Sequence, residues 1–270
     1  MYYVFKMIPK IIHQIYWNFK NINADMPEKW KQLQIHCKTL YENNGWKYIL
    51  WNRIMGNKFI RDNFPWLWKN YSLSTNIERV DILRYAILYI YGGMYLDLDT
   101  VCNKIFIPDS NYKVILPATL LHDTFVLNNF FSINNNILLS VPRHRFWKRL
   151  LDNINNTYVS DFLPKFIYIS MKTGPYMLQN TYENYFKKED ITIYKKLYKI
   201  NTKSKKKSYF THISTKSWVD VFDALHLAYF LFLFITIFLN RFIFKNFRNF
   251  FISYISVNIF LIISLCRKEM

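Results

Sequence analysis

The sequence has few of the residues that interrupt regular structure, and few cysteines. Its 270 residues include only 5 glycines, 8 prolines and 3 cysteines. So little glycine and proline, with 20% aromatic residues, excludes a disordered or low-complexity chain and predicts a packed core. The cysteines are far apart and odd in number, so they predict neither a disulfide framework nor a cysteine-based zinc site; they are Cys37, Cys102 and Cys266.

The start of the chain lacks a long apolar run, and the whole chain has half as many acidic residues as basic ones. Lys6 and Pro9 interrupt the first apolar stretch, so we expect no secretory signal or membrane anchor there. The 36 basic and 18 acidic residues give a formal net charge of +18. This charge favours nucleic acid, an anionic membrane surface or phosphorylated substrates as partners. A genome biased toward lysine explains it equally well, so charge alone selects no partner.

A helix is predicted in the stretch that follows residue 75. Apolar residues recur at helical spacing from Val80 to Ile90, while Asp81 and Arg84 lie three residues apart and project from nearly the same face. The helix should end at Gly92 and Gly93, because glycine allows the backbone angles of a tight turn and fits poorly in a helix interior.

Residues 94–99 alternate as a short strand does, and a period of two would place Asp97 and Asp99 on one face at the strand end. Two such carboxylates repel each other unless a positive group lies beside them. An Asp-x-Asp pair suits a hard cation such as Mg²⁺ or Mn²⁺ that also holds substrate phosphates. The pair alone is a weak signal, and a solvated strand end with two acids is the alternative.

The complete order of this region carries more information than the acid pair. The motif R-x-D-x-x-R-Y (residues 79–85), an apolar helix, G-G-x-Y (92–95) and D-x-D (97–99) follow one another. This order resembles the glycosyltransferases with the DXD sugar-binding motif, glycosyltransferase family 32, which includes the initiating mannosyltransferase of yeast and the mannosyl-inositol-phosphoceramide synthases. The resemblance implies an α/β, GT-A type nucleotide-diphospho-sugar transferase fold over residues 1–218.

The same resemblance implies ligands and roles. Asp97 and Asp99 would hold Mn²⁺ or Mg²⁺ on the diphosphate of a nucleotide sugar, with GDP-mannose favoured as donor and a UDP-sugar as the alternative. Asp81 and Arg84 would contact the sugar or ribose and the phosphate. These four residues are therefore the expected catalytic residues.

The N-terminal part supports the α/β class without the resemblance. A strand at residues 11–15, a helix at 27–41 and a second strand at 45–51 predict a parallel βαβ unit. The first strand also begins the pattern of the family, I-P-K-I-I-H-Q, after which an aromatic ring lies near the nucleotide base. Either Tyr16 or Trp17 would be that ring, and the alternative is that both belong to the core. We expect His13 to be a structural histidine.

The middle of the chain matches the family less closely. Residues 113–116 predict a strand, and residues 125–141 predict strand, turn and strand, with Asn128 or Asn129 at a strand end near the sugar. Pro142-Arg143-His144-Arg145 lacks the final proline of the P-x-H-P segment of the family.

Two later segments also match. Thr173-Gly174-Pro175 opens a helix, and its N-terminus would hold an anion or simply start the helix. His212, Ser217 and Trp218 match the closing H-x-x-x-x-S-W, in which His212 would be a third metal ligand while Ser217 and Trp218 donate to diphosphate oxygens.

The composition changes after Trp218. Residues 195–216 are basic and form either a solvated loop or a contact with lipid head groups. Residues 219–270 contain two apolar segments, about 222–239 and 250–265, which predict a membrane hairpin, a surface pair or a buried hairpin. The flanking basic residues would leave the catalytic domain on the cytoplasmic face of the membrane. Cellular relatives work in the lumen of the Golgi, so both orientations stay open.

Taken together, these residues and the resemblance to the family imply a metal-dependent, retaining glycosyltransferase. It would move a hexose, with mannose first, from a nucleotide sugar to a membrane-associated acceptor such as an inositol-phosphoceramide-like lipid or a glycan. A regulatory membrane subunit is a further partner that the resemblance implies. The alternative is a membrane-tethered binding or scaffold protein with a degenerate transferase fold, and a nucleic-acid-binding role rests on the net charge alone.

Overall fold

The computed structural model describes residues 7–19, 24–119, 132–194, 197–200 and 208–213, together with Thr236. The chain divides into two compact units, residues 1–218 and residues 219–270. Of the second unit only Thr236, which is helical, is described, so the hairpin predicted at 222–239 and 250–265 lies outside the described residues. None of the helices within the described ranges is long and apolar enough to cross a bilayer.

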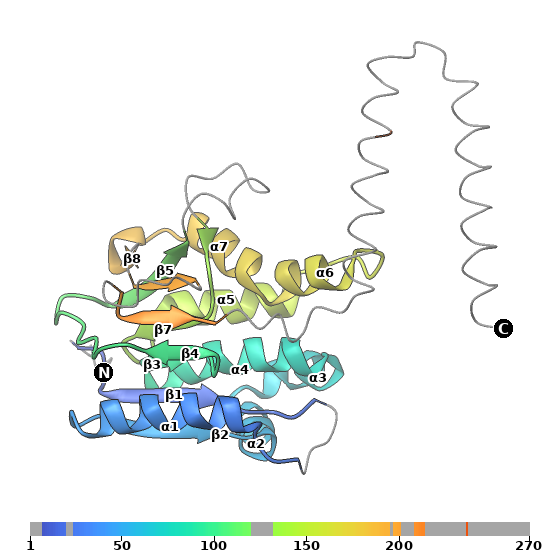
Figure 1. The fold of residues 1–270 in the computed structure, drawn as a ribbon. Helices are drawn as coiled ribbons and strands as arrows, with labels where there is room; N and C mark the ends of the chain where they lie inside the picture. Colours follow the sequence, from blue (N-terminus) through green and yellow to red (C-terminus); the bar gives the residue numbers. More distant parts are fainter. Residues whose placement is uncertain are drawn as a thin grey trace, which may run out of the picture. The chain divides into compact units, whose positions relative to one another are not determined.

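A mixed sheet forms the centre of the first unit (Figure 1). Its parallel part is made of β2 (Lys47–Trp51), β1 (Ile11–Ile15) and β3 (Gly93–Leu96), with α1 (Glu28–Glu42) between β1 and β2 in the chain. This confirms the predicted βαβ unit. The sheet continues through strands that are antiparallel to their neighbours, with β8 parallel to β5; they are β7 (Ile137–Ser140), β5 (Val114–Thr119), β6 (Ser132–Ile133) and β8 (Ile191–Tyr194).

Side chains of the central strands alternate between two hydrophobic cores, as the period of two requires. Tyr95 and Leu138 belong to one core, whereas their strand neighbours Met94 and Leu139 belong to the other. The first core packs against most of the helices: α2 (Arg53–Asn63), α3 (Pro65–Leu73), α4 (Asn76–Tyr91), α5 (Arg145–Asn156) and α7 (Pro175–Glu183). The second core packs against α1. The sheet is therefore covered on both faces, as expected for an α/β fold.

Helix α4 passes through the interior of the unit. Every residue from Asp81 to Leu88 is buried. The helix starts with a capping box, in which Thr75 accepts from the backbone N–H of Glu78 at 3.5 Å and the Glu78 carboxylate accepts from the backbone N–H of Thr75 at 2.8 Å. A buried helix can carry charged side chains only if they are paired, so Asp81 and Arg84 need partners inside the protein.

A small second sheet joins distant parts of the chain. In it β10 (Phe210–His212) lies between β4 (Thr100–Cys102) and β9 (Tyr198–Ile200). His212 is the register partner of Thr100, and the backbone N–H of Ile213 donates to the carbonyl of Asp99 at 2.8 Å. This sheet brings the end of the described unit next to the D-x-D segment.

The structure contains a disulfide that the cysteine count did not predict. Cys37 in α1 is bonded to Cys102 in β4, with their Cα atoms 5.3 Å apart and a sequence separation of 65. The pairing could not be read from the sequence, because tertiary folding brings together two cysteines whose spacing carries no signal.

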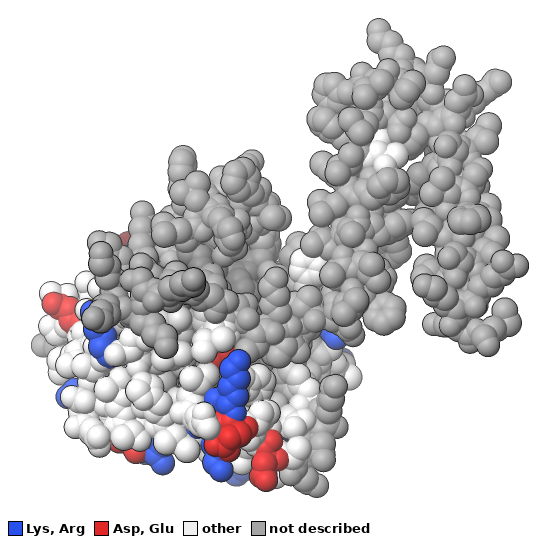
Figure 2. Space-filling model, viewed as in Figure 1, with Lys and Arg blue, Asp and Glu red and all other residues white. Residues whose placement is uncertain are grey.

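Charged side chains on one face of the first unit are mixed in sign. Figure 2 shows Lys or Arg next to Asp or Glu on this face, separated by large uncharged areas. Within the described residues, Lys58 pairs with Asp62 at 2.6 Å and Lys148 pairs with Asp152 at 2.5 Å. No continuous basic stripe of the kind that follows a nucleic-acid backbone is present on the described part of the face shown.

Candidate active site

The turn from α4 into β3 requires glycine. Gly92 has φ of +64°, and a Cβ on it would lie 2.6 Å from the carbonyl oxygen of Ser140 in β7. Gly93 has φ of +86°, and its Cβ would lie 2.5 Å from the carbonyl oxygen of Ile11 in β1. Both positions need positive φ and close backbone approach, which only glycine allows without strain. The two glycines thus let β3 enter the middle of the sheet directly after the helix.

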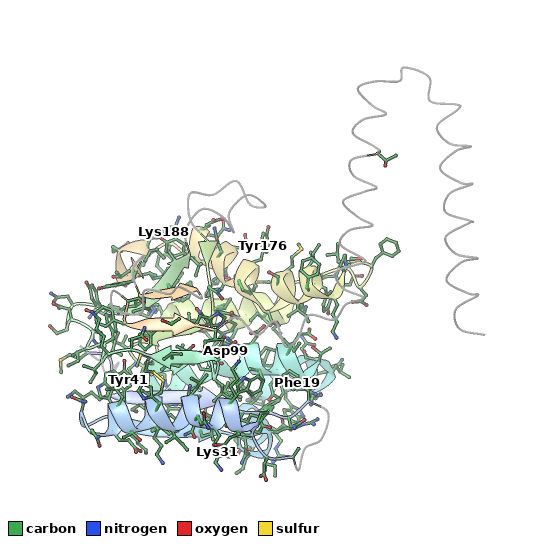
Figure 3. The ribbon with its side chains drawn as sticks, viewed as in Figure 1. Phe19, Lys31, Tyr41, Asp99, Tyr176 and Lys188 are labelled. Carbon is green, nitrogen blue, oxygen red and sulfur yellow. A yellow bond between two sulfur atoms is a disulfide. The ribbon has the colours of Figure 1, made fainter. Side chains whose placement is uncertain are left out.

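Strand β3 ends earlier than the alternation predicted. It stops at Leu96, and residues 97–99 form a turn in which the backbone N–H of Thr100 donates to the carbonyl of Asp97 at 3.2 Å. The prediction that Asp97 and Asp99 share one face of a strand was therefore wrong. The turn brings the two acids together instead, and Asp99 lies at the start of β4 (Figure 3).

His212 completes a group of three potential metal ligands. One ligand atom from each of Asp97, Asp99 and His212 lies within 4.8 Å of the other two. His212 Nε2 is 3.1 Å from Asp99 Oδ1. Burial lowers the pKa of His212, but the hydrogen bond and charge of Asp99 and the charge of Asp97 outweigh this, so its pKa is raised. Two carboxylates and an imidazole form a donor set that a divalent cation such as Mn²⁺ accepts.

The surroundings of the Asp97 carboxylate are suited to a nearby cation. Its Oδ1 atom accepts from the hydroxyl of Tyr95 at 2.7 Å and from Arg84 Nη1 at 3.1 Å. Burial raises the pKa of Asp97, Arg84 opposes the rise, and the charge of Asp99 adds to it. A bound cation would relieve the repulsion between the two acids. Asp97, Asp99 and His212 are therefore the residues of the described chain that could hold a metal.

A second group of buried polar residues lies beside the first. Arg84 Nη2 is 3.0 Å from Asp81 Oδ1, and the side chains of both residues are less than a tenth exposed. Asp81 also accepts from Asn135 Nδ2 at 2.9 Å and from the hydroxyl of Thr173 at 3.0 Å. Burial raises the pKa of Asp81 to about 6, while Arg84 and Thr173 act in the opposite direction. Arg84 connects the two groups, because it contacts both Asp81 and Asp97.

Arg84 still has an unused donor. Its Nη1 also donates to the carbonyl of Asn135 at 2.8 Å. Its Nε is buried and has no hydrogen-bond partner in the described part of the chain. Burial would lower the pKa of Arg84, but the charges of Tyr95, Asp97 and Asp81 outweigh it and the pKa is raised. A permanently charged, buried donor without a partner is suited to an oxygen of a sugar or a phosphate.

Sequence reasoning missed two partners of Asp81. We looked for a polar residue at Asn128 or Asn129, which lie outside the described residues, whereas Asn135 occupies the place beside Asp81. Thr173 was expected at a helix start, and α7 does begin two residues later, but its hydroxyl binds Asp81. The run of three asparagines at 134–136, just before β7, was the one available signal.

The two aromatic candidates for the base lie in different surroundings. Trp17 is buried, and its Nε1 has no partner among the described residues. Tyr16 is half-buried, and its hydroxyl donates to the carbonyl of Asp25 at 2.8 Å. Ser217 and Trp218 lie outside the described residues, so their predicted roles remain predictions.

His13 is a structural histidine, as predicted. It is fully buried, its Nδ1 accepts from Trp51 Nε1 at 3.2 Å, and its Nε2 is 3.1 Å from the carbonyl of Gly92. Burial lowers the pKa of His13 to about 4, so the ring is neutral at pH 7. His144, in the loosely matching segment, caps α5 by accepting from the backbone N–H of Phe146 at 3.3 Å.

Comparisons with known proteins show similarity to glycosyltransferases. Residues 27–121 match the family described as "Glycosyltransferase sugar-binding region containing DXD motif". Inositol phosphoceramide mannosyltransferase 2 of Schizosaccharomyces pombe is 33% identical over 181 residues, which are 66% of this chain and 47% of that protein. Mannosyl phosphorylinositol ceramide synthase SUR1 of Saccharomyces cerevisiae is 34% identical over 183 residues, which are 67% of this chain and 43% of that protein.

The chain thus spans about half the length of these curated relatives. Among solved structures, the PaToxG glycosyltransferase aligns at 16% identity with a TM-score of 0.45, covering 64% of this chain and 68% of that chain.

Proposed function

Since residues 27–121 match the family of glycosyltransferases with a DXD-containing sugar-binding region, we propose that this protein is a metal-dependent, retaining hexosyltransferase with a GT-A type fold. Mannose is the first candidate for the sugar and GDP-mannose for the donor. The acceptor is a membrane lipid with an inositol phosphoceramide-like headgroup. The names of the two relatives support mannose as the sugar and an inositol phosphoceramide-like lipid as the acceptor. The observation that carries the proposal is the meeting of Asp97, Asp99 and His212 beside Arg84.

In the proposed reaction the bond between the anomeric carbon and the diphosphate oxygen breaks. A new bond forms from that carbon to a hydroxyl oxygen of the acceptor, the hydroxyl proton is released, and the nucleoside diphosphate leaves. Asp97, Asp99 and His212 would hold a divalent ion, which would supply Lewis-acid stabilisation of the leaving diphosphate. Arg84 directs its unpaired Nε at an oxygen of the donor, and Asp81 accepts from sugar hydroxyls.

The disulfide supports one of the two membrane orientations. A bond between Cys37 and Cys102 persists in an oxidising compartment and is rare in the cytosol. We therefore place residues 1–218 on the lumenal side of a Golgi-type or ER-type membrane, against the orientation that the flanking basic residues suggested. In sealed microsomes this unit should resist added protease, and digestion without detergent would contradict the placement.

The test of the activity is hydrolysis of nucleotide sugars by the detergent-solubilised protein. A panel of UDP- and GDP-sugars with Mn²⁺ should identify one donor. The Asp97→Asn, Asp99→Asn double variant should lose at least about 10²-fold of the rate, because a metal supplies several kcal/mol of transition-state stabilisation. Asp62→Asn, an exposed acid on α2 that pairs with Lys58, is the matched control and should keep the rate.

Binding of Mn²⁺ to the free protein, followed by electron paramagnetic resonance, separates the site from turnover. The double variant should not bind Mn²⁺, and the Asp62→Asn control should bind it as the native protein does. Equal binding by all three proteins would contradict the proposed ligands. Absence of both hydrolysis and donor binding across the panel would instead support a membrane-tethered scaffold with a degenerate transferase fold.

A further inference from the structure

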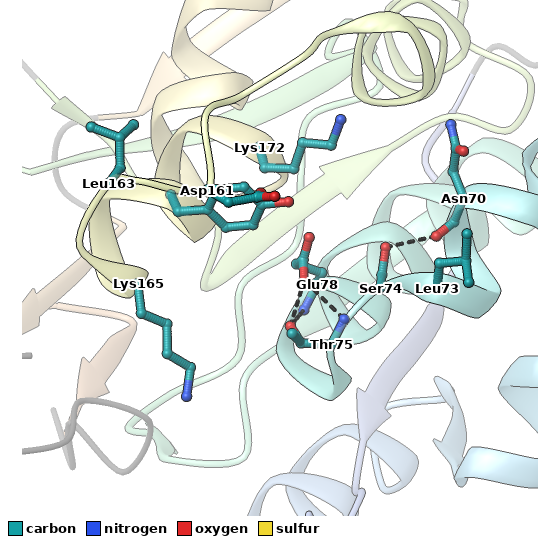
Figure 4. Close-up of a pocket in the computed structure, with 10 residues that line it drawn as sticks. Asn70, Leu73, Ser74, Thr75, Glu78, Asp161, Leu163, Lys165 and Lys172 are labelled. Carbon is teal, nitrogen blue, oxygen red and sulfur yellow. Dashed lines mark hydrogen bonds between the residues drawn. The ribbon is translucent and has the colours of Figure 1, made fainter.

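A pocket of about 540 Å³ opens where the end of α3, the start of α4 and α6 (Lys165–Lys172) meet (Figure 4). This volume is in the range of small-molecule binding sites. Most of its lining is polar or charged, including Asn70, Glu78, Asp161, Lys165, Tyr168 and Lys172. Figure 4 shows the two lysines on the α6 side and Glu78 on the α4 side. The pocket therefore offers donors and acceptors on facing walls.

The two lysines supply cationic donors for an anion, and the lining carboxylates of Glu78 and Asp161 balance their charge. Neither forms an ion pair with a carboxylate of the described residues. Lys165 is exposed, whereas Lys172 is half-buried and donates to the carbonyl of Thr157. Burial lowers the pKa of Lys172, while the charges of Glu78 and Asp161 act in the opposite direction. A partly desolvated ammonium group without a carboxylate partner gains from contact with a phosphate.

The other polar residues of the pocket suit hydroxyl groups. Glu78 keeps its position because its carboxylate already accepts from the hydroxyl and the backbone N–H of Thr75, at 2.6 and 2.8 Å. Asp161 provides exposed acceptor oxygens, Tyr168 a hydroxyl and Asn70 an amide. A ligand that combines a phosphate with several hydroxyl groups would match both the lysines and these residues.

Three highly exposed apolar side chains belong to the pocket lining or lie close to lining residues in sequence. Phe162 is 86% exposed, Tyr158 is 84% exposed and Leu73 is 79% exposed, the highest values for large apolar residues in the described ranges. Leu73 lines the pocket, Phe162 lies between the lining residues Asp161 and Leu163, and Tyr158 follows the residue that Lys172 binds. We call these three residues the apolar rim. Highly exposed apolar residues next to a polar site are a feature of contacts with protein or membrane.

The pocket adjoins the proposed sugar-binding residues through two elements. Lys172 is followed by Thr173, whose hydroxyl donates to Asp81 at 3.0 Å. Glu78 precedes Asp81 by three residues on α4, a rise of about 4.5 Å along the helix axis. A ligand in the pocket would therefore lie about one helical turn from Asp81, on the side of the helix start.

We propose that this pocket binds the phosphorylated polyol headgroup of a lipid acceptor, with Lys165 and Lys172 on the phosphate, while the apolar rim enters the surface of the bilayer. The proposal rests on the proposed transferase function and specifies where its acceptor binds. The pocket recognises the headgroup chemistry, which a free polyol phosphate shares. The apolar rim distinguishes the lipid from the free compound.

Direct binding tests the pocket without turnover. The detergent-solubilised full chain is titrated calorimetrically with inositol 1-phosphate in the absence of donor. Lys165→Glu should weaken binding about tenfold or more, because it removes a charge-assisted contact. Lys172→Met provides a second test and should also weaken binding, whereas Lys29→Glu, exposed on α1, should bind as the native protein does. No binding by the native protein, or equal binding by Lys165→Glu, would overturn the proposal.

Transfer assays test the apolar rim. A Leu73→Ser, Tyr158→Ser, Phe162→Ser variant should raise the KM for inositol phosphoceramide in vesicles about tenfold and leave transfer to free inositol 1-phosphate unchanged. An Ile54→Ser, Phe186→Ser variant alters residues that are 76% and 71% exposed on other elements and should resemble the native protein. Equal loss with both acceptors, or no loss with either, would refute the membrane contact.

Hydrolysis of the donor without acceptor separates this proposal from the proposed function. None of the pocket or rim variants should change it, because none alters the three metal-ligand candidates. If the native protein hydrolyses no nucleotide sugar, the transferase function fails while the titration still decides the pocket.

Discussion

Loss of the Cys37–Cys102 disulfide is expected to lower the free energy of unfolding by roughly 4 kcal/mol. The bond closes a loop of 65 residues. In the chain-entropy treatment, a loop of that length removes about 14 cal/mol/K from the unfolded chain, or roughly 4 kcal/mol at 25 °C. In a unit of about 200 residues each kcal/mol shifts the midpoint of thermal unfolding by about 2–4 °C, so the expected decrease is about 8–16 °C.

The effect should extend to metal binding. Cys102 is in β4, three residues after Asp99, and β4 pairs with the strand that carries His212. The disulfide ties β4 to α1 and so restrains two of the three proposed ligands. We therefore expect the variant without the disulfide to bind Mn²⁺ more weakly, even at temperatures where it remains folded.

Thermal unfolding followed by tryptophan fluorescence measures the first effect, with a Cys37→Ser, Cys102→Ser variant beside the native protein. Cys266→Ser is the control and should leave the midpoint unchanged. Thiol titration of the unfolded, unreduced native chain should find one free thiol, since 3 cysteines are present and 2 are paired. Three free thiols, or midpoints within about 2 °C of each other for the native protein and the double variant, would refute the reasoning.

Three further predictions concern the surroundings of the site. Gly92→Ala should lower the free energy of unfolding by at least about 2 kcal/mol in urea unfolding, because its methyl group would meet the Ser140 carbonyl. Gly45 has a similar φ of +77° but open space around it, so Gly45→Ala should cost less. The pKa of His13 is about 4 in the folded protein and about 6.5 in the unfolded chain, so below pH 6.5 the unfolded chain binds a proton that the folded protein does not. The free energy of unfolding should therefore fall by roughly 2–3 kcal/mol between pH 7 and 4.5. His13→Gln should remove this part of the pH dependence of thermal unfolding, and an unchanged profile would contradict it. Arg84→Met should cost about 3–5 kcal/mol in urea unfolding, because the buried carboxylate of Asp81 and the partly buried carboxylate of Asp97 lose their partner. A loss below about 1 kcal/mol would show that the pairing is weak.

Local patterns predicted the elements that carry the site. The glycine pair ends α4 where expected, and β1, α1 and β2 occupy nearly the predicted ranges, because helix and strand periods and glycine act over a few neighbouring residues. The resemblance to the family also named Asp97, Asp99 and His212, which the structure brings together. Their grouping could not follow from spacing alone, since β10 reaches β4 only through the complete fold.

The features that sequence reasoning missed are tertiary. Asn135 and Thr173 reach Asp81 across sequence separations of 54 and 92 residues, and no period relates them. The disulfide joins α1 to a strand of the second sheet, which was not predicted at all. The turn at residues 97–99 replaced a strand because Asp97 and Thr100 bond to each other through the backbone, a competition that alternation does not reveal.

The small sheet of β4, β10 and β9 affects the order in which the protein is completed during synthesis. Asp97 and Asp99 leave the ribosome more than one hundred residues before His212, which stands in the last strand of the described unit. Closing so long a loop is slow, and it can occur only when β10 is available. A partly synthesised chain therefore has two of the three potential metal ligands, Asp97 and Asp99. The third, His212, joins them when β10 pairs with β4. Firm cation binding would then mark the completed fold.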